Sequence, residues 1–119
     1  MIKIPSGVTS ICNGAFFGCS GLTGELKIPG SVTYIGDCAF AGCSGLTGEL
    51  KIPDSVKEIG GSAFAYCRRL TGELIIPGSV TKIGDCAFKD CSGLTKIRVP
   101  KGAEIGKDAF SSGVEIEKY

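Results

Sequence analysis

The chain has 119 residues, of which 43% are hydrophobic and 21% charged, as in an ordinary globular domain. Its formal net charge is +1, so it lacks the basic excess of proteins that bind nucleic acid or anionic membranes. No apolar run approaches the ~18 residues of a membrane span, and the first residues lack a signal-peptide layout. We therefore expect no nucleic-acid partner and no membrane insertion.

A repeat of 23–24 residues organises the chain. It is anchored on an Ile-Pro or Val-Pro pair, and these pairs contain all five prolines. The coils begin near Ile4, Ile28, Ile52, Ile76 and Val99. A period of 20–29 residues with fixed Leu, Ile, Phe and Cys positions is typical of a leucine-rich repeat solenoid, in which stacked coils share one core.

Each coil is predicted to start with a short strand, as in residues 25–28, where alternate side chains point inward. The motif LTGELKIP has one residue more than LTKIRVP at residues 94–100, which predicts a small bulge or turn at its glycine. A second extended segment follows, as in residues 31–36, and then a corner made of a turn or a single helical turn. The recurring glycines after the inward isoleucine are predicted to need unusual backbone angles: Gly36, Gly60, Gly84 and Gly106.

The pattern I-P-x-S-V-x-x-I-G-x-x-A-F-x-x-C-x-x-L resembles the BspA-like leucine-rich repeat of bacterial surface proteins and some protists. It covers nearly the whole chain, although the first coil has Cys12 in place of the recurring glycine and the last coil lacks its cysteine. We expect a single domain over residues 1–119, a right-handed solenoid of about five coils of 23–24 residues, mostly strand and loop. The resemblance implies a binding or adhesion module that is not an enzyme, located at the cell surface or secreted.

Four of the seven cysteines occupy one repeat position between inward-facing residues, and we interpret them as a buried structural ladder: Cys19, Cys43, Cys67 and Cys91. The spacing of Cys38 from Cys43 would allow a local disulfide, but Ser62 replaces the first cysteine in the third repeat. Zinc is disfavoured because the chain has no histidine and no C-x₂-C pair. We expect no metal or cofactor. So many unpaired thiols suit a reducing or anaerobic setting.

Departures from the repeat are the candidates for partner binding. The third coil has Tyr66, Arg68 and Arg69 where its neighbours have Gly, Ser and Gly, and tyrosine and arginine are favoured interface anchors. Drift at permissive surface positions is the alternative explanation. The candidate set for contact with a protein of unknown identity is Tyr34, Tyr66, Arg68, Arg69, Ile75, Lys27, Lys51 and Arg98.

The chain ends predict a second kind of contact. The last residues, GVEIEKY, look like a charged closing strand, whereas the first coil is expected to expose its apolar rung: Ile2, Ile4, Val8, Ile11 and Phe16. That predicts a homodimer through the N-terminal coil or a fragment of a longer array. Three functions follow: a non-enzymatic module that binds protein or glycan on its outward strand face, a self-assembling structural unit, or a small intracellular inhibitor that occludes a partner.

Overall fold

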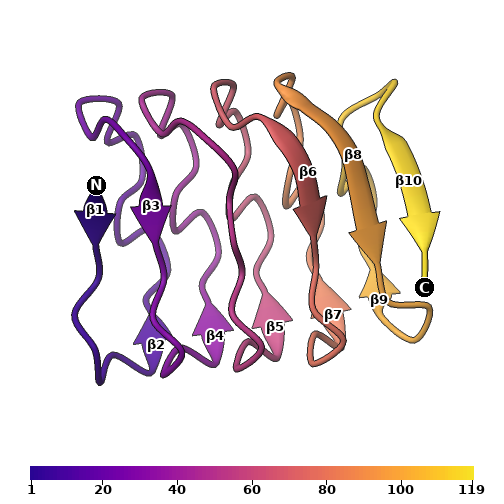
Figure 1. The fold of residues 1–119 in the computed structure, drawn as a ribbon, viewed down its shortest axis with the longest axis horizontal. Helices are drawn as coiled ribbons and strands as arrows, with labels where there is room; N and C mark the ends of the chain where they lie inside the picture. The colour runs from indigo at the N-terminus through magenta and orange to yellow at the C-terminus, as the bar shows by residue number, and fades with distance from the viewer.

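The computed structural model describes residues 1–119, and it is a parallel β-solenoid in which the chain alternates between two sheets at every coil (Figure 1). Every paired strand is parallel to its neighbour. The leucine-rich repeat architecture predicted from the 24-residue period is therefore confirmed. The fold contains no α-helix, and so no helix that would cross a membrane.

The first sheet consists of two pieces, β1–β3 and β6–β8–β10, and the second sheet is continuous in the order β2-β4-β5-β7-β9. The first sheet contains β1 (Ile2–Lys3), β3 (Leu26–Lys27), β6 (Gly72–Ile75), β8 (Leu94–Val99) and β10 (Glu115–Lys118). The second contains β2 (Ser10–Ile11), β4 (Tyr34–Ile35), β5 (Glu58–Ile59), β7 (Lys82–Ile83) and β9 (Glu104–Ile105).

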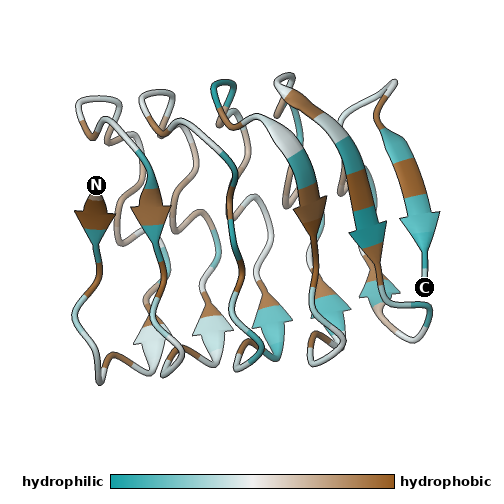
Figure 2. Cartoon of the chain, viewed as in Figure 1, coloured by the Kyte–Doolittle hydropathy of each residue, from teal (hydrophilic) through white to brown (hydrophobic).

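A core of 29 buried residues lies between the two sheets. The repeat stacks identical side chains on one another, because residues one period apart share one register. The rings of Phe16, Phe40 and Phe64 stack at 5.2 Å, and Phe88 continues the stack at 5.3 Å. Figure 2 shows the same alternation of hydrophobic and hydrophilic residues along β6, β8 and β10.

The corners are successive hydrogen-bonded turns, so the alternative of single helical turns is wrong. In the second coil, Ala39 N donates to Gly36 O at 3.2 Å and Cys43 N donates to Phe40 O at 3.1 Å. The third residue of each such turn has a positive φ, 57° at Cys38 and 76° at Gly42, which places it in the left-handed region. A four-residue turn whose third residue is left-handed cannot continue into a helix.

The prediction that the glycines after the inward isoleucine need unusual backbone angles is also wrong. None of these four glycines has a positive φ. They are required by close approach between coils, because a Cβ on Gly84 would lie 2.4 Å from the backbone nitrogen of Gly61 in the preceding coil. Cys12 occupies this position in the first coil and is exposed, since no earlier coil packs against it in this structure.

The predicted bulge at the glycine of LTGELKIP is present, with φ values of 99°, 78° and 77° at Gly24, Gly48 and Gly72. Its position explains why the first sheet is in two pieces. The bulged strand β6 pairs with β8, which has no bulge glycine, and β3 pairs with β1 at two residues. Where two bulged strands are neighbours, no strand pairing forms and only isolated bridges remain.

The unpaired strand between β3 and β6 consists of residues 49–52. These residues belong to no sheet, and their one backbone pairing is the isolated bridge between Lys51 and Lys27. Glutamate side chains lie over the bulges on both sides: Glu25 Oε1 is 2.8 Å from a Cβ placed on Gly48, and Glu49 Oε1 is 2.7 Å from one placed on Gly72. These carboxylates occupy the space between successive bulged strands.

Candidate functional site

The outer face of the first sheet, which we call the strand face, carries two columns of side chains in register. One column contains Lys3, Lys27, Lys51, Ile75, Arg98 and Glu117, and the other contains Glu73, Lys96 and Glu115. The four predicted partner-binding residues Lys27, Lys51, Ile75 and Arg98 therefore lie in one column. Ile75 is the apolar member of a mostly cationic column, and it is 50% exposed.

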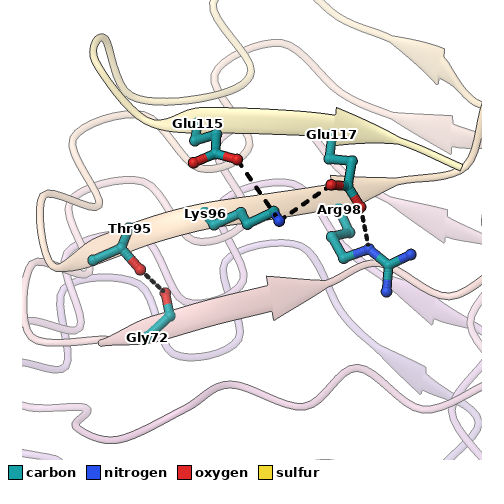
Figure 3. A network of polar contacts seen from close by, with 6 residues as sticks. All are labelled: Gly72, Thr95, Lys96, Arg98, Glu115 and Glu117. Atoms are coloured by element: carbon teal, nitrogen blue, oxygen red, sulfur yellow. Dashed lines mark hydrogen bonds and ion pairs between the residues drawn. The ribbon is translucent and has the colours of Figure 1, made fainter.

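The C-terminal part of the strand face is already held by ion pairs (Figure 3). Lys96 Nζ lies 3.1 Å from Glu117 Oε2, and Arg98 Nε donates to Glu117 Oε1 at 2.8 Å. The hydrogen bond and the charge of Lys96 lower the pKa of the Glu117 carboxyl. The Arg98 guanidinium also lies 5.1 Å from the centre of the Tyr119 ring. Arg98 thus fastens the closing strand β10, so it is less free to meet a partner than the two lysines.

Tyr66, Arg68 and Arg69 form an exposed corner just before β6, and Figure 2 shows this turn as a hydrophilic tip. Tyr66 has a φ of +63° where the first two coils have Gly18 and Gly42 and the fourth has Asp90, and the Arg68 guanidinium lies 5.8 Å from its ring centre. Arg69 stands at a position that is glycine in the neighbouring coils. At the equivalent Gly93, an added Cβ would lie only 2.2 Å from the carbonyl oxygen of Leu70 in the preceding coil. The corner bond from Leu70 N accordingly lengthens to 3.4 Å.

Two grooves flank the unpaired residues 49–52 on the strand face. The larger, of about 450 Å³, lies toward β6, and we call it the β6 groove. It is lined by Glu49, Leu50, Lys51, Ile52, Asp54, Glu73, Ile75, Pro77, Gly78 and Tyr119. The smaller groove, of about 320 Å³, lies toward β3. These grooves were not predicted from the sequence. The sequence feature that accompanies them is the run of consecutive LTGEL motifs, each with a bulge at its glycine.

Tyr34 lies apart from the other candidates, on β4 in the second sheet. Its hydroxyl donates to Asn13 Oδ1 at 3.3 Å. Burial, followed by the negative charges of Asp37 and Glu58, raises the pKa of the phenol. The structure therefore divides the predicted partner-binding residues between the strand face, the adjoining corner before β6, and the second sheet, where Tyr34 lies alone.

The cysteine ladder is buried in its interior coils. Cys43, Cys67 and Cys91 are fully covered, whereas Cys19 at the N-terminal end is half-buried. Each buried thiol donates to the phenylalanine carbonyl of the preceding coil, as from Cys67 Sγ to Phe40 O at 3.2 Å. Desolvation raises the pKa of Cys91 to about 12. In the last coil Ser111 donates to Phe88 O in the same manner, so a hydroxyl replaces the thiol there.

The N-terminal coil forms an apolar hollow of about 360 Å³ at the end of the solenoid. Its lining includes all five residues of the predicted self-association set: Ile2, Ile4, Val8, Ile11 and Phe16. The expectation that this rung is bare is only partly correct, because Ile4 and Ile11 are buried and the other three are half-buried. No three acidic or cysteine side chains converge to hold a metal ion.

The repeat of this chain is that of a known protein family. The model of the BspA type leucine rich repeat region matches residues 1–117 in six copies. The chain belongs to the BspA-type leucine-rich repeat family. Six copies agree with the six strand positions of the first sheet, which are five strands and the unpaired residues 49–52. Leucine-rich repeats of this family serve as protein-interaction modules, are typically not enzymes, and are associated with bacterial surface proteins.

A solved structure supports the same assignment. A crystal structure of a leucine-rich repeat protein from Bacteroides ovatus ATCC 8483 matches with a TM-score of 0.85 and 32% identity. The match covers 100% of the BspA-type chain described here and 30% of the Bacteroides chain. No curated protein matches the sequence.

Proposed function

We propose that this BspA-type repeat binds a partner protein through the strand face and the corner that precedes β6. The observation that carries the proposal is the concentration of repeat departures in the third coil. Tyr66 is 42% exposed beside Arg68, and Ile75 is 50% exposed where the three preceding members of its column are lysines. Exposed aromatic, arginine and apolar side chains grouped on a rigid scaffold are typical of binding hot spots.

The scaffold supports recognition by shape, without turnover. Each coil is fixed to its neighbours by backbone hydrogen bonds and stacked phenylalanines, so the exposed side chains are presented with little ordering cost. Because the family is associated with bacterial surface proteins, we place this binding at a bacterial surface.

The test is selection of binders from a displayed library of protein domains, followed by affinity measurement. The quadruple variant Y66G/R68S/R69G/I75K restores the repeat consensus, and it is expected to weaken a selected domain at least tenfold. The variant should fold well, since glycine relieves the positive φ at Tyr66 and the crowding at Arg69. Tyr34→Ser on the second sheet is the matched control, and serine already occupies that register at Ser10. Equal losses in both variants would contradict the proposal.

Self-association is a second candidate, favoured by the apolar hollow at the N-terminal coil. A second copy would cover this hollow with its own N-terminal coil, so that the two apolar rungs are buried against each other. Light scattering across a concentration series should then show a dimer that persists in reductant and is lost in Val8→Glu. A monomer at every concentration would exclude this function, and a dimer lost on reduction would assign the contact to thiols.

A further inference from the structure

The corner that precedes β6 gathers positive charges that form no ion pair. Arg68 and Arg69 are exposed there, and Lys89 follows in the next coil, where its carbonyl accepts a hydrogen bond of 2.8 Å from Tyr66 N. Every ion pair of the structure joins β8 to β10, so these cations are unpaired, and so is Asp90, the carboxylate of this corner. Three cations and one carboxylate leave the corner more positive than the whole chain, whose formal net charge is +1.

Two exposed aromatic side chains belong to the same row of corners. Phe17 of the first coil is 65% exposed, and Tyr66 of the third coil is 42% exposed. Backbone hydrogen bonds of 2.7 and 2.8 Å hold the corners of these three coils in register, so the two residues lie two coils, or about 10 Å, apart along the solenoid. Between them the second coil has only small residues, Ala, Gly, Cys, Ser and Gly at 41–45. We call Phe17, Tyr66, Arg68, Arg69 and Lys89 the corner ridge.

The backbone of the third corner is strained by its large residues. Tyr66 has a φ of +63°, a conformation that a bulky residue rarely adopts. In the second coil Ser44 N donates to Gly42 O at 2.8 Å, whereas Arg68 N makes no such bond in the third. Drift at permissive positions does not explain residues that the backbone resists, and strain of this kind is concentrated at functional sites.

We propose that the corner ridge binds an acidic segment of the partner protein that carries an apolar or aromatic side chain among its carboxylates. The proposal rests on the proposed function and names the chemistry of the partner. Carboxylates of the segment pair with Arg68 and Arg69, whose planar guanidinium groups suit bidentate contact, and with the ammonium of Lys89. The apolar side chain lies over the small residues 41–45, between Phe17 and Tyr66.

The exposed aromatic residues favour a peptide over a polyanion. A sulfated polysaccharide would meet the same cations, but it has no apolar group to cover Phe17. Burial of exposed aromatic side chains beside arginine is instead typical of contacts between proteins. Charge and apolar area together therefore specify the segment.

The experiment selects displayed seven-residue peptides of random sequence on the whole chain. A parallel selection on the variant F17A/R68S/R69G identifies peptides that bind elsewhere, and these are discarded. The remaining peptides are expected to combine Asp or Glu with Phe, Trp or Leu. Their affinity, measured by fluorescence anisotropy, should fall in high salt because exposed charges are screened.

Two variants separate the contributions of charge and apolar contact. R68S/R69G restores the residues of the second coil, and it should weaken a selected peptide at least tenfold. Phe17→Ala changes no charge, and alanine already occupies this register at Ala41 and Ala65. It should weaken the same peptide at least fivefold, because the apolar contact is lost.

Lys57→Thr is the matched control, since it removes a cation from the second sheet. Threonine occupies this register in the neighbouring coils at Thr33 and Thr81, so the variant should fold and bind the peptide with unchanged affinity. Circular dichroism shows whether all variants keep the fold.

Selected peptides without carboxylates overturn the ridge proposal, as does equal weakening by R68S/R69G and Lys57→Thr. Selection of no acidic peptide, together with heparin binding that requires Arg68 and Arg69, assigns the cations to a polyanion and also overturns it. None of these results decides the proposed function, which is tested separately by the loss of selected protein domains in Y66G/R68S/R69G/I75K.

Discussion

Replacing Gly84 by alanine tests why the repeat retains a glycine after each inward isoleucine. A Cβ at this position would lie 2.4 Å from Gly61 N and 2.7 Å from Gly60 C. These are backbone atoms of the preceding coil, and they cannot rotate away as a side chain would. Ordinary van der Waals contact begins near 3.4 Å, so the third and fourth coils must separate by about 1 Å at this corner.

The cost follows from the bonds that cross this corner. Gly84 N donates to Ile59 O and Ser62 N donates to Asp85 O, both at 2.8 Å. A separation of about 1 Å breaks both, at about 0.5–1.5 kcal/mol each. Overpacking adds about 1–3 kcal/mol. We therefore expect Gly84→Ala to lower the free energy of unfolding by about 3 kcal/mol.

The assay is urea denaturation followed by far-ultraviolet circular dichroism, because the chain has no tryptophan. With a slope of about 2 kcal/mol per molar urea, the midpoint should fall by about 1.5 M. Gly78→Ala is the control, since its Cβ would meet no atom within 4 Å and its φ is not positive. Its midpoint should change little or rise. Equal midpoints for the two variants would refute close approach as the reason for the glycine.

The remaining predictions concern the thiol ladder and the second sheet's corner. Cys67→Ala should cost about 1 kcal/mol, because it removes one of the two hydrogen bonds to the Phe40 carbonyl and leaves only the bond from Cys43 N, whereas Cys67→Ser should cost less; equal urea midpoints would show that the thiol bond is unimportant. The unfolded thiol has a pKa of 9.0 and folded Cys91 one of about 12, and burial also raises the pKa of Cys67 and Cys43, so stability is complete below pH 9 and Cys91 alone lowers it by about 1.4 kcal/mol per pH unit above that, with the other two thiols adding to the slope. Midpoints measured from pH 8 to 10.5 should show this slope, reduced in Cys91→Ser, and a flat profile would contradict it. Gly61→Asn should raise the free energy of unfolding by about 1 kcal/mol. The new side-chain oxygen would accept a hydrogen bond from the backbone amide of Asp85, which has no partner, just as Asn13 Oδ1 accepts one from Asp37 N. An unchanged thermal midpoint would argue against this reasoning.

Much of the fold was predictable because repetition makes the core visible in the sequence. The inward positions of Leu26, Ile35 and Phe40 and the bulge at the LTGELKIP glycine are as predicted, and the cysteine ladder is buried except at Cys19, which is half-buried. The role of the recurring glycine was not predictable in this way. A positive φ and a close approach both select glycine, and only the distance to the next coil tells them apart.

The candidate site depended more on tertiary structure. The sequence indicated Ile75 and Tyr66 as departures, but it placed Tyr34 in the same set although Tyr34 lies on the opposite sheet. It gave no indication that Arg98 is held by Glu117 and Tyr119, because those contacts join residues of different coils. Departures from a repeat identify residues that differ between coils. Whether those residues lie on the same face of the solenoid depends on the path of the chain through each coil.

The sequence by itself determined the solenoid, its period, its inward residues and its membership of a repeat family, because each coil repeats the same local pattern and buries it against the next. The tertiary structure alone decided where the first sheet opens. Residues 46–53 repeat residues 22–29 letter for letter, yet β3 is paired with β1 whereas residues 49–52 keep only an isolated bridge from Lys51 to Lys27. The physical reason is that strand pairing depends on both neighbouring strands. One bulged strand can still form a ladder with its neighbour, whereas two adjacent bulged strands form only isolated bridges.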